Sequence, residues 1–189
     1  MAGPERFETR KLLVYWKRIR GGKRFPCSAD IDRTELALFE PNMFELKIVD
    51  PKTVMVMHVG DTLIARMGGL DLRGQNLFEI FDAARVSEMW RRFQLMFDIA
   101  CALCTHNEVP TPEGDDLRAE TLFLPVVDGP DQARSIFGTI YYAHGPDSRN
   151  VELQDPAMVF RAETFLEVGN GYAIALDGSD ISRLRRSTA

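Results

Sequence analysis

The stretch MFELKIVDPKTVMVMHVG, residues 43–60, decides the fold class. From Phe44 to Ile48 every second residue is apolar and the residues between are charged, which is the period of a strand with one buried face. The Asp-Pro-Lys at residues 50–52 is a typical turn, and residues 53–59 form a second apolar run of strand length. We therefore predict an antiparallel hairpin.

The residues after this hairpin predict helices first and further strands later. Residues 61–82 contain short helical pieces separated by glycines, and residues 83–105 keep a helical apolar period that predicts one long helix. Residues 117–145 predict two strands joined by the turn at 128–132. The tail from Pro146 fits either another hairpin or a helix and a strand. Without βαβ alternation, this order predicts an α+β fold in which helices cover an antiparallel sheet.

An amphipathic helix is predicted before the hairpin, over residues 5–20. Gly21-Gly22 would end this helix, Asp32 would cap a short second one, and Pro41 would close that one. Four apolar residues of the first helix share one stripe at helical spacing. They are Leu12, Tyr15, Trp16 and Ile19.

Composition and charge exclude several classes of protein. No apolar run reaches the roughly 18 residues of a membrane span, and the charged N-terminus has no apolar core of a secretory signal. Three cysteines, an odd number, argue against a disulfide framework. Residues 1–24 carry +6 and the remainder −11, which leaves the net charge at −5. A basic arm on an acidic body, without a nucleic-acid motif, does not predict nucleic-acid binding, and we expect a cytoplasmic protein with no membrane insertion.

The order of elements resembles the PAS domain family, and within it a group of small bacterial single-PAS proteins. The N-terminal segment of that group has the pattern YW…R…G…P…DID. It is matched here by Tyr15-Trp16, Arg20-Gly21-Gly22, Pro26 and Asp30-Ile31-Asp32. Several later features of the group are matched in the same order. They are Gly69, Asp71, Leu72 and Gly74 of a Gly-x-Asp-Leu-x-Gly turn, and the strands LFLPVV (122–127) and FGTIYY (137–142). The group's strand-end Gly-Thr is Gly60-Asp61 here.

This resemblance implies a five-stranded antiparallel sheet with helices over one face, plus the N-terminal helix. It divides the chain into a basic amphipathic helix (1–24), a PAS-like domain (25–145) and a C-terminal extension (146–189). It implies a stand-alone sensory or regulatory module in bacterial signal transduction, which binds a small ligand, a partner protein or both, and does no chemistry itself. No kinase, cyclase or DNA-binding segment is evident, so we expect a homodimer or a signalling partner protein.

The resemblance also indicates where a ligand would bind, between the long helix and the sheet. The candidate pocket residues are His58, Arg66, Trp90, Phe93, Phe97 and Tyr141. The ligand itself is unknown, and no cofactor is predicted. In PAS proteins the N-terminal helix often packs outside the sheet at a dimer interface, a role that would suit Leu12, Tyr15, Trp16 and Ile19.

Other cofactor chemistry finds little support in the sequence. Cys101, Cys104, His106 and Cys27 could be zinc ligands, but the spacing matches no standard finger. The Cys-x-x-Cys falls at the end of the predicted long helix, the wrong pole for a redox pair, so buried core thiols are favoured. For haem, His106 at the far end of that helix and His58 in a strand are poor candidates.

Two further motifs lack the residues that their chemistry needs. A flavin adduct needs a cysteine after the hairpin, where GQNLFEIF (74–81) has none. MGGLDLRG (67–74) lacks the Lys-Ser/Thr pair of a phosphate loop, so glycine turns are favoured, and no metal site is predicted.

One enzyme class remains as an alternative function. Cone-shaped α+β enzymes of the steroid-isomerase kind also wrap helices around a curved sheet, with a buried Asp or His as general base. Their helices precede a long run of strands, whereas the hairpin at 43–60 precedes the long helix here. No catalytic constellation pairs a nucleophile with a base, and we therefore predict a sensory module rather than an enzyme.

Overall fold

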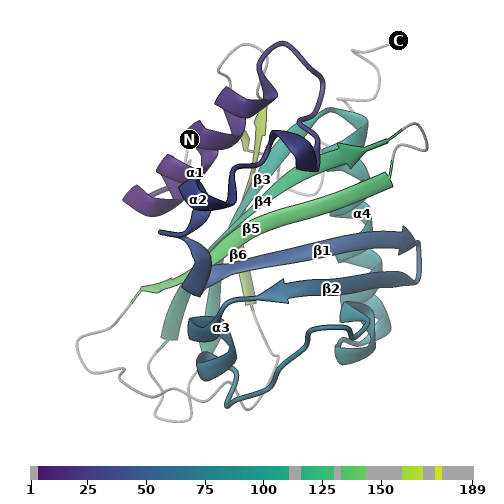
Figure 1. Ribbon diagram of the computed structural model, residues 1–189. Helices are drawn as coiled ribbons and strands as arrows, with labels where there is room; N and C mark the ends of the chain where they lie inside the picture. Colours follow the sequence, from purple (N-terminus) through teal and green to yellow (C-terminus); the bar gives the residue numbers. More distant parts are fainter. Residues whose placement is uncertain (1–3, 111–115, 130–132, 144–158, 168–172, 176–189) are drawn as a thin grey trace.

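One antiparallel sheet organises the computed structural model, which describes residues 4–110, 116–129, 133–143, 159–167 and 173–175 (Figure 1). Its strand order is β2-β1-β5-β4-β3-β6-β7. The strands are β1 (Met43–Asp50), β2 (Thr53–Val59), β3 (Cys101–Pro110), β4 (Asp116–Asp128), β5 (Ala133–Ala143), β6 (Val159–Glu167) and β7 (Ala173–Ala175). The α-helices are α1 (Phe7–Arg20), α2 (Arg33–Leu36), α3 (Asp61–Arg66) and α4 (Ala83–Asp98). Short 3-10 helices are η1 (Ser28–Asp30), η2 (Glu40–Asn42) and η3 (Leu77–Ile80).

The first five strands confirm the predicted α+β, PAS-like sheet. β1 and β2 form the predicted hairpin, and β4 pairs with β5 as the sequence indicated. The predicted 146–189 extension contributes β6 and β7, which pair antiparallel with each other, while β6 also pairs with β3. Within the described residues, the hairpin alternative for this part of the chain is therefore the correct one.

The long helix predicted over residues 83–105 is wrong in its second part. α4 ends at Asp98, the chain turns at Ala100 with φ 53, and β3 begins at Cys101. Both faces of this strand are covered, so its apolar residues are consecutive rather than alternating, which periodicity cannot distinguish from a buried helix. Cys101, Cys104 and His106 therefore lie on a strand.

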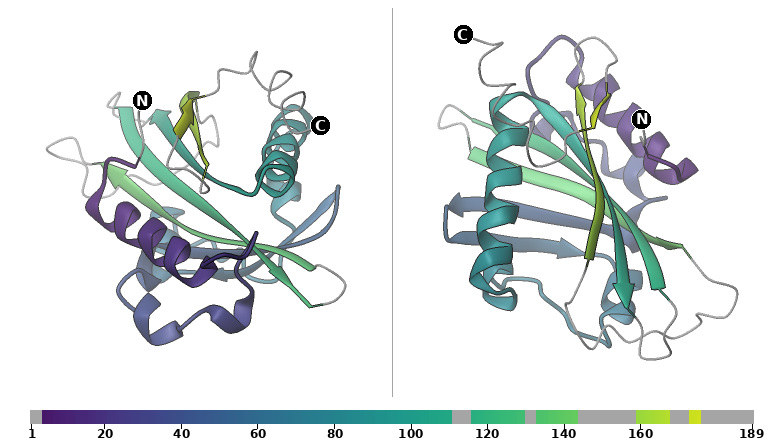
Figure 2. Two further views of the ribbon diagram at one scale, coloured as in Figure 1. Left: turned by 90° about the horizontal axis from the view of Figure 1, so that it is seen from above. Right: turned by 180° about the vertical axis from the view of Figure 1, so that it is seen from behind.

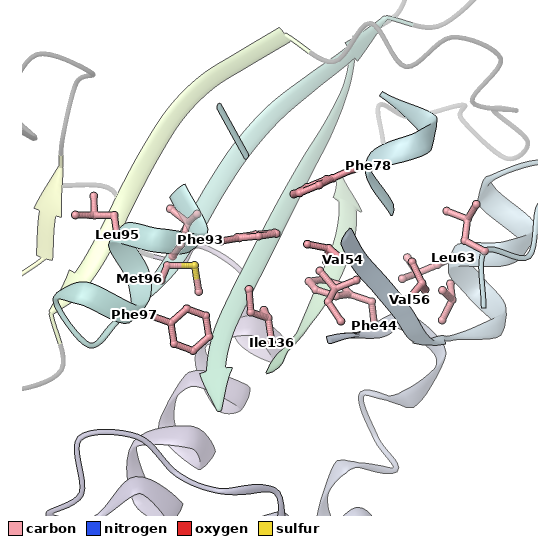
Figure 3. Packing of buried hydrophobic residues seen from close by; sticks show 14 of the residues in the cluster. Phe44, Val54, Val56, Leu63, Phe78, Phe93, Leu95, Met96, Phe97 and Ile136 are labelled. Atoms are coloured by element: carbon pink, nitrogen blue, oxygen red, sulfur yellow. The ribbon is translucent and has the colours of Figure 1, made fainter. Parts of the chain in front are cut away.

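The sheet buries a separate hydrophobic cluster on each face. We call the face covered by α3, η3 and α4 the inner face, and the face covered by α1 and α2 the outer face; Figure 2 shows α1 and α4 on opposite sides of the sheet. Figure 3 shows part of the inner cluster. Its labelled residues are Phe44, Val54, Val56, Leu63, Phe78, Phe93, Leu95, Met96, Phe97 and Ile136.

The glycine-rich connection between α3 and η3 forms turns, as the sequence predicted. Gly74 has φ 77, which favours glycine, and its amide donates to the Val56 carbonyl at 2.8 Å. The Asp71 carboxylate accepts from the Arg73 amide at 3.0 Å, and Leu72 is buried in the inner cluster. This loop therefore closes against β2.

Helix α1 covers the sheet of its own chain. Leu12 and Trp16 are fully buried in the outer cluster, and the Trp16 indole donates to the Pro125 carbonyl of β4 at 2.9 Å. The Tyr15 hydroxyl accepts from the Asp32 amide at 2.8 Å, and Asp32 caps α2 as predicted. Hydrogen bonds thus join separate parts of the N-terminal segment to each other and to β4.

The length and hydropathy of the helices test whether any of them could span a membrane. None of the helices in the described ranges has the length and apolar character needed to cross a bilayer.

Candidate functional site

A cation and a phenol meet on the inner face of the sheet. Arg66, in the last turn of α3, lies with its guanidinium carbon 5.6 Å from the centre of the Tyr142 ring on β5. Arg66 Nη1 is shielded from solvent and has no hydrogen-bond partner among the described residues. Burial raises the pKa of Tyr142, and the Arg66 charge opposes that shift. A ligand oxygen beside Nη1 would supply the partner that this buried donor lacks.

Aromatic side chains form part of the apolar inner face, and α4 contributes Trp90, Phe93 and Phe97. Phe93 is 1% exposed, and its ring centre is 5.8 Å from that of Phe123 on β4. The Phe97 ring is 5.6 Å from Phe25, and Trp90 packs partly buried against the same cluster. Figure 3 shows Phe93 and Phe97 pointing from α4 toward the sheet. The predicted pocket residues of α4 therefore do lie on the inner face.

His58, a predicted pocket residue, faces the other way. The β1–β2 register shifts by one residue at Met57, because Glu45 pairs with His58 whereas Leu46 pairs with Val56. This bulge turns His58 away from the inner cluster, and its Nε2 lies 3.0 Å from the Glu40 carboxylate. A haem or pocket role for His58 loses its geometric basis.

Tyr141, the other misplaced residue, also lies on the outer face. It pairs across the strands with Glu120, and the Arg6 guanidinium lies 5.7 Å from its ring. Its neighbour Tyr142 points to the inner face and meets Arg66. The prediction therefore chose Tyr141, although Tyr142 is the tyrosine on the inner face. Alternation along a strand does not say which of two neighbouring residues faces the helices.

A second polar cluster lies on the outer face, at the start of α1. The Glu120 carboxylate, 5% exposed, accepts from the Glu5 amide at 2.6 Å and lies 3.0 Å from His106 Nε2. The Arg6 amide also donates to it at 3.3 Å. Burial raises the pKa of Glu120, but these hydrogen bonds outweigh burial and lower it to about 2. The hydrogen bond between His106 and Glu120 raises the pKa of His106.

The three cysteines do not come together. Cys101 lies in the inner cluster and Cys104 in the outer one, as expected for residues three apart in a strand. Both are fully buried, which agrees with the core-thiol prediction, and none of the three cysteines, all of which lie in the described ranges, forms a disulfide. The zinc set of Cys27, Cys101, Cys104 and His106, which the sequence did not favour, is therefore not brought together as a set.

Glu120 is the residue that sequence reasoning missed. It faces His106 directly across β3 and β4. That pairing becomes visible only once residues 101–110 are recognised as a strand. Cys104 lies beside this carboxylate, and burial raises the pKa of the Cys104 thiol.

The enzyme alternative needs a buried acid or base inside the curve of the sheet. Among residues whose burial the structure describes, Glu120 is the buried carboxylate, and it lies on the outer face beneath α1. Its oxygens are occupied by two backbone amides and His106. The observed arrangement gives the cone-shaped enzyme no support.

Comparison with known proteins gives one family match. A family model described as PAS domain matches residues 5–141. No curated protein matches the chain.

Several solved structures are similar to part of the chain at low identity. A VqmA–ligand–DNA complex from Vibrio cholera is 14% identical with a TM-score of 0.43, covering 59% of this chain and 51% of that one. A single-residue variant of RsLOV is 9% identical with a TM-score of 0.41, covering 63% and 73%. The PAS domain of an HTR-like protein from Haloarcula marismortui is 18% identical with a TM-score of 0.38, covering 59% and 89%. The chain spans about half the length of the VqmA chain.

Proposed function

Because the chain belongs to the PAS domain family, whose members are sensory and regulatory modules, we propose that it binds a small molecule on the inner face of its sheet. The ligand would carry an acidic or polar group for Arg66 and an apolar body for Phe93 and Phe97. Binding would be reported to another protein or a second copy. We also propose that the chain is one of the small bacterial single-PAS proteins, because Tyr15-Trp16, Arg20-Gly21-Gly22, Pro26 and Asp30-Ile31-Asp32 match the N-terminal pattern of that group.

The observation that carries this proposal is the Nη1 atom of Arg66. A buried donor without a partner costs free energy, so such atoms are uncommon unless another group completes them. Tyr142 offers its ring face rather than an acceptor to this guanidinium. A carboxylate or carbonyl of a ligand would complete the site and explain why a cation lies at the edge of an aromatic core.

Replacing Arg66 with alanine should remove most of the bound ligand. Protein purified from cells and measured by native mass spectrometry is expected to carry a non-covalent adduct in the wild type. Loss of one charged hydrogen bond should weaken binding about tenfold or more. Arg73→Ala is the matched control, because Arg73 pairs with Asp71 on the surface. Equal adduct in Arg66→Ala and wild type, or no adduct in any of the three, would contradict ligand binding at Arg66.

A second role is favoured by the outer surface of α1, and we propose that this surface binds a second copy of the chain. Phe7 and Val14 are 58% and 65% exposed and lie two helical turns apart, so they share one side of the helix. Lys11 lies between them, with its ammonium 4.3 Å from the centre of the Phe7 ring. The predicted stripe of Leu12, Trp16 and their neighbours faces the sheet, so Phe7 and Val14 are the residues that α1 offers to a partner.

Replacing Val14 with glutamate should weaken self-association. A buried charge at the centre of an apolar contact is expected to raise the dimer dissociation constant by about tenfold or more. Sedimentation velocity over a concentration series measures this, with Val49→Glu as the control at an exposed valine of β1. A monomeric wild type, or equal dissociation constants for the two variants, would count against the α1 interface.

A further inference from the structure

Three metal-binding residue types converge on the outer face, between the sheet and the start of α1. Cys104 and His106 are two residues apart on β3, so their side chains lie on the same face. Glu120 is the direct partner of His106 on β4. One ligand atom from each of the three lies within 4.8 Å of the other two. The strand geometry itself brings a sulfur, a nitrogen and an oxygen together.

The surroundings of Glu120 orient it as a ligand. The amides of Glu5 and Arg6 donate to its carboxylate and hold it in place, as hydrogen bonds around metal sites commonly do. His106 has one nitrogen on Glu120, whereas its Nδ1 is buried and has no partner among the described residues. Because Nδ1 has no partner among them, the ring can keep its proton on Nδ1 and offer Nε2, beside the Glu120 carboxylate, to an ion.

We propose that Cys104, His106 and Glu120 bind a borderline-soft divalent metal ion of the Zn²⁺ type. Zinc accepts thiolate, imidazole and carboxylate ligands at about 2.0–2.3 Å, so the donors of a tetrahedral site lie within about 4 Å of each other. The three observed donor atoms lie within 4.8 Å of one another, so they would have to approach by less than about 1 Å. The thiol proton leaves to solvent when the sulfur binds. The His106 side chain is 22% exposed, which gives the ion a route inward.

The competing explanation is that Glu120 serves only as an anion at the N-terminus of α1. Its contacts with the amides of Glu5 and Arg6 fit that role, because helix N-termini attract negative charge. They do not account for the thiol or for the unpaired Nδ1 atom. A metal ion would replace only the His106–Glu120 hydrogen bond and leave both amide contacts intact. Water, which reaches the partly exposed His106 side chain, would supply the fourth ligand of a tetrahedral site.

Cobalt binding tests the site directly, because Co²⁺ replaces Zn²⁺ and a thiolate ligand gives a charge-transfer band in the near ultraviolet. The intact chain is expected to show this band at stoichiometric Co²⁺, and added Zn²⁺ should abolish it because zinc binds such sites more tightly. Cys104→Ser should lose the band. Cys101→Ser should keep it, because Cys101 lies on the opposite face of the same strand.

A second variant separates ligand loss from misfolding. Glu120→Gln keeps an acceptor oxygen for the two amides of α1 but removes the carboxylate, so the affinity for Co²⁺ should fall about tenfold or more while far-ultraviolet circular dichroism stays unchanged. No thiolate band in the wild type would overturn the proposal. A band that survives in Cys104→Ser, or that disappears equally from a folded Cys101→Ser, would overturn it as well.

Discussion

Replacing Gly138 with alanine should lower the free energy of unfolding by about 3 kcal/mol or more. Gly138 lies in β5, between Phe44 of β1 and Phe123 of β4. A Cβ atom at this position would overlap the carbonyl oxygen of Leu122 and would lie 2.8 Å from Cζ of the Phe44 ring. The ring could rotate, but the carbonyl belongs to the neighbouring strand and can move only if the sheet separates locally. Domains of this kind are stable by about 5–15 kcal/mol, so the loss is a large share.

Chemical denaturation of both proteins measures this effect, and Gly22→Ala is the control. A Cβ atom at Gly22 meets nothing within 4 Å, so that change should stay within about 0.5 kcal/mol. A Gly138→Ala protein with the denaturation midpoint of wild type would show that the β4–β5 contact is looser than the structure has it.

Elements with one polar face could be predicted from the sequence. The hairpin of β1 and β2 has charged residues on its outer side, and α1 has basic residues around its apolar stripe. In each case the pattern has only one period that fits, so both elements were confirmed with small differences at their ends. Asp32 was predicted as a cap because its side chain acts locally, on the amide of Thr34.

The candidate sites depend on information that no local pattern holds. The first part of β3 is apolar on both faces, so residues 101–105 were assigned to the preceding helix, and the pairing of His106 with Glu120 could not be seen. His58 was placed in the pocket because a regular strand would put it there, but the bulge at Met57 reverses it. The choice between Tyr141 and Tyr142 likewise depends on which set of alternate residues in β5 faces α4. Register and bulges are properties of paired strands, so one strand's sequence does not determine them.

Replacing Trp16 with alanine should lower the free energy of unfolding by about 3–5 kcal/mol. Trp16 is fully buried against the sheet of its own chain, and the truncated side chain would leave a cavity between α1 and β4. The substitution would also remove the donor for the Pro125 carbonyl, which lies 2.9 Å from the indole nitrogen. Trp16→Phe keeps most of the apolar volume, so a loss of about 1–2 kcal/mol would isolate the hydrogen bond with its unpaired acceptor.

The same measurement decides whether α1 covers its own sheet or that of a second copy. If Trp16 packs within one chain, the loss of stability in Trp16→Ala should be the same at every protein concentration. If it packs against a partner, the wild-type stability should rise with concentration and the variant should lose that dependence. Val49→Ala is the control, because Val49 is 57% exposed on β1, away from the α1 surface proposed to bind a second copy, and should change stability by no more than about 0.5 kcal/mol. A concentration-dependent effect at Trp16 would mean that helix α1 is exchanged between chains, and the outer cluster would then be shared by two copies.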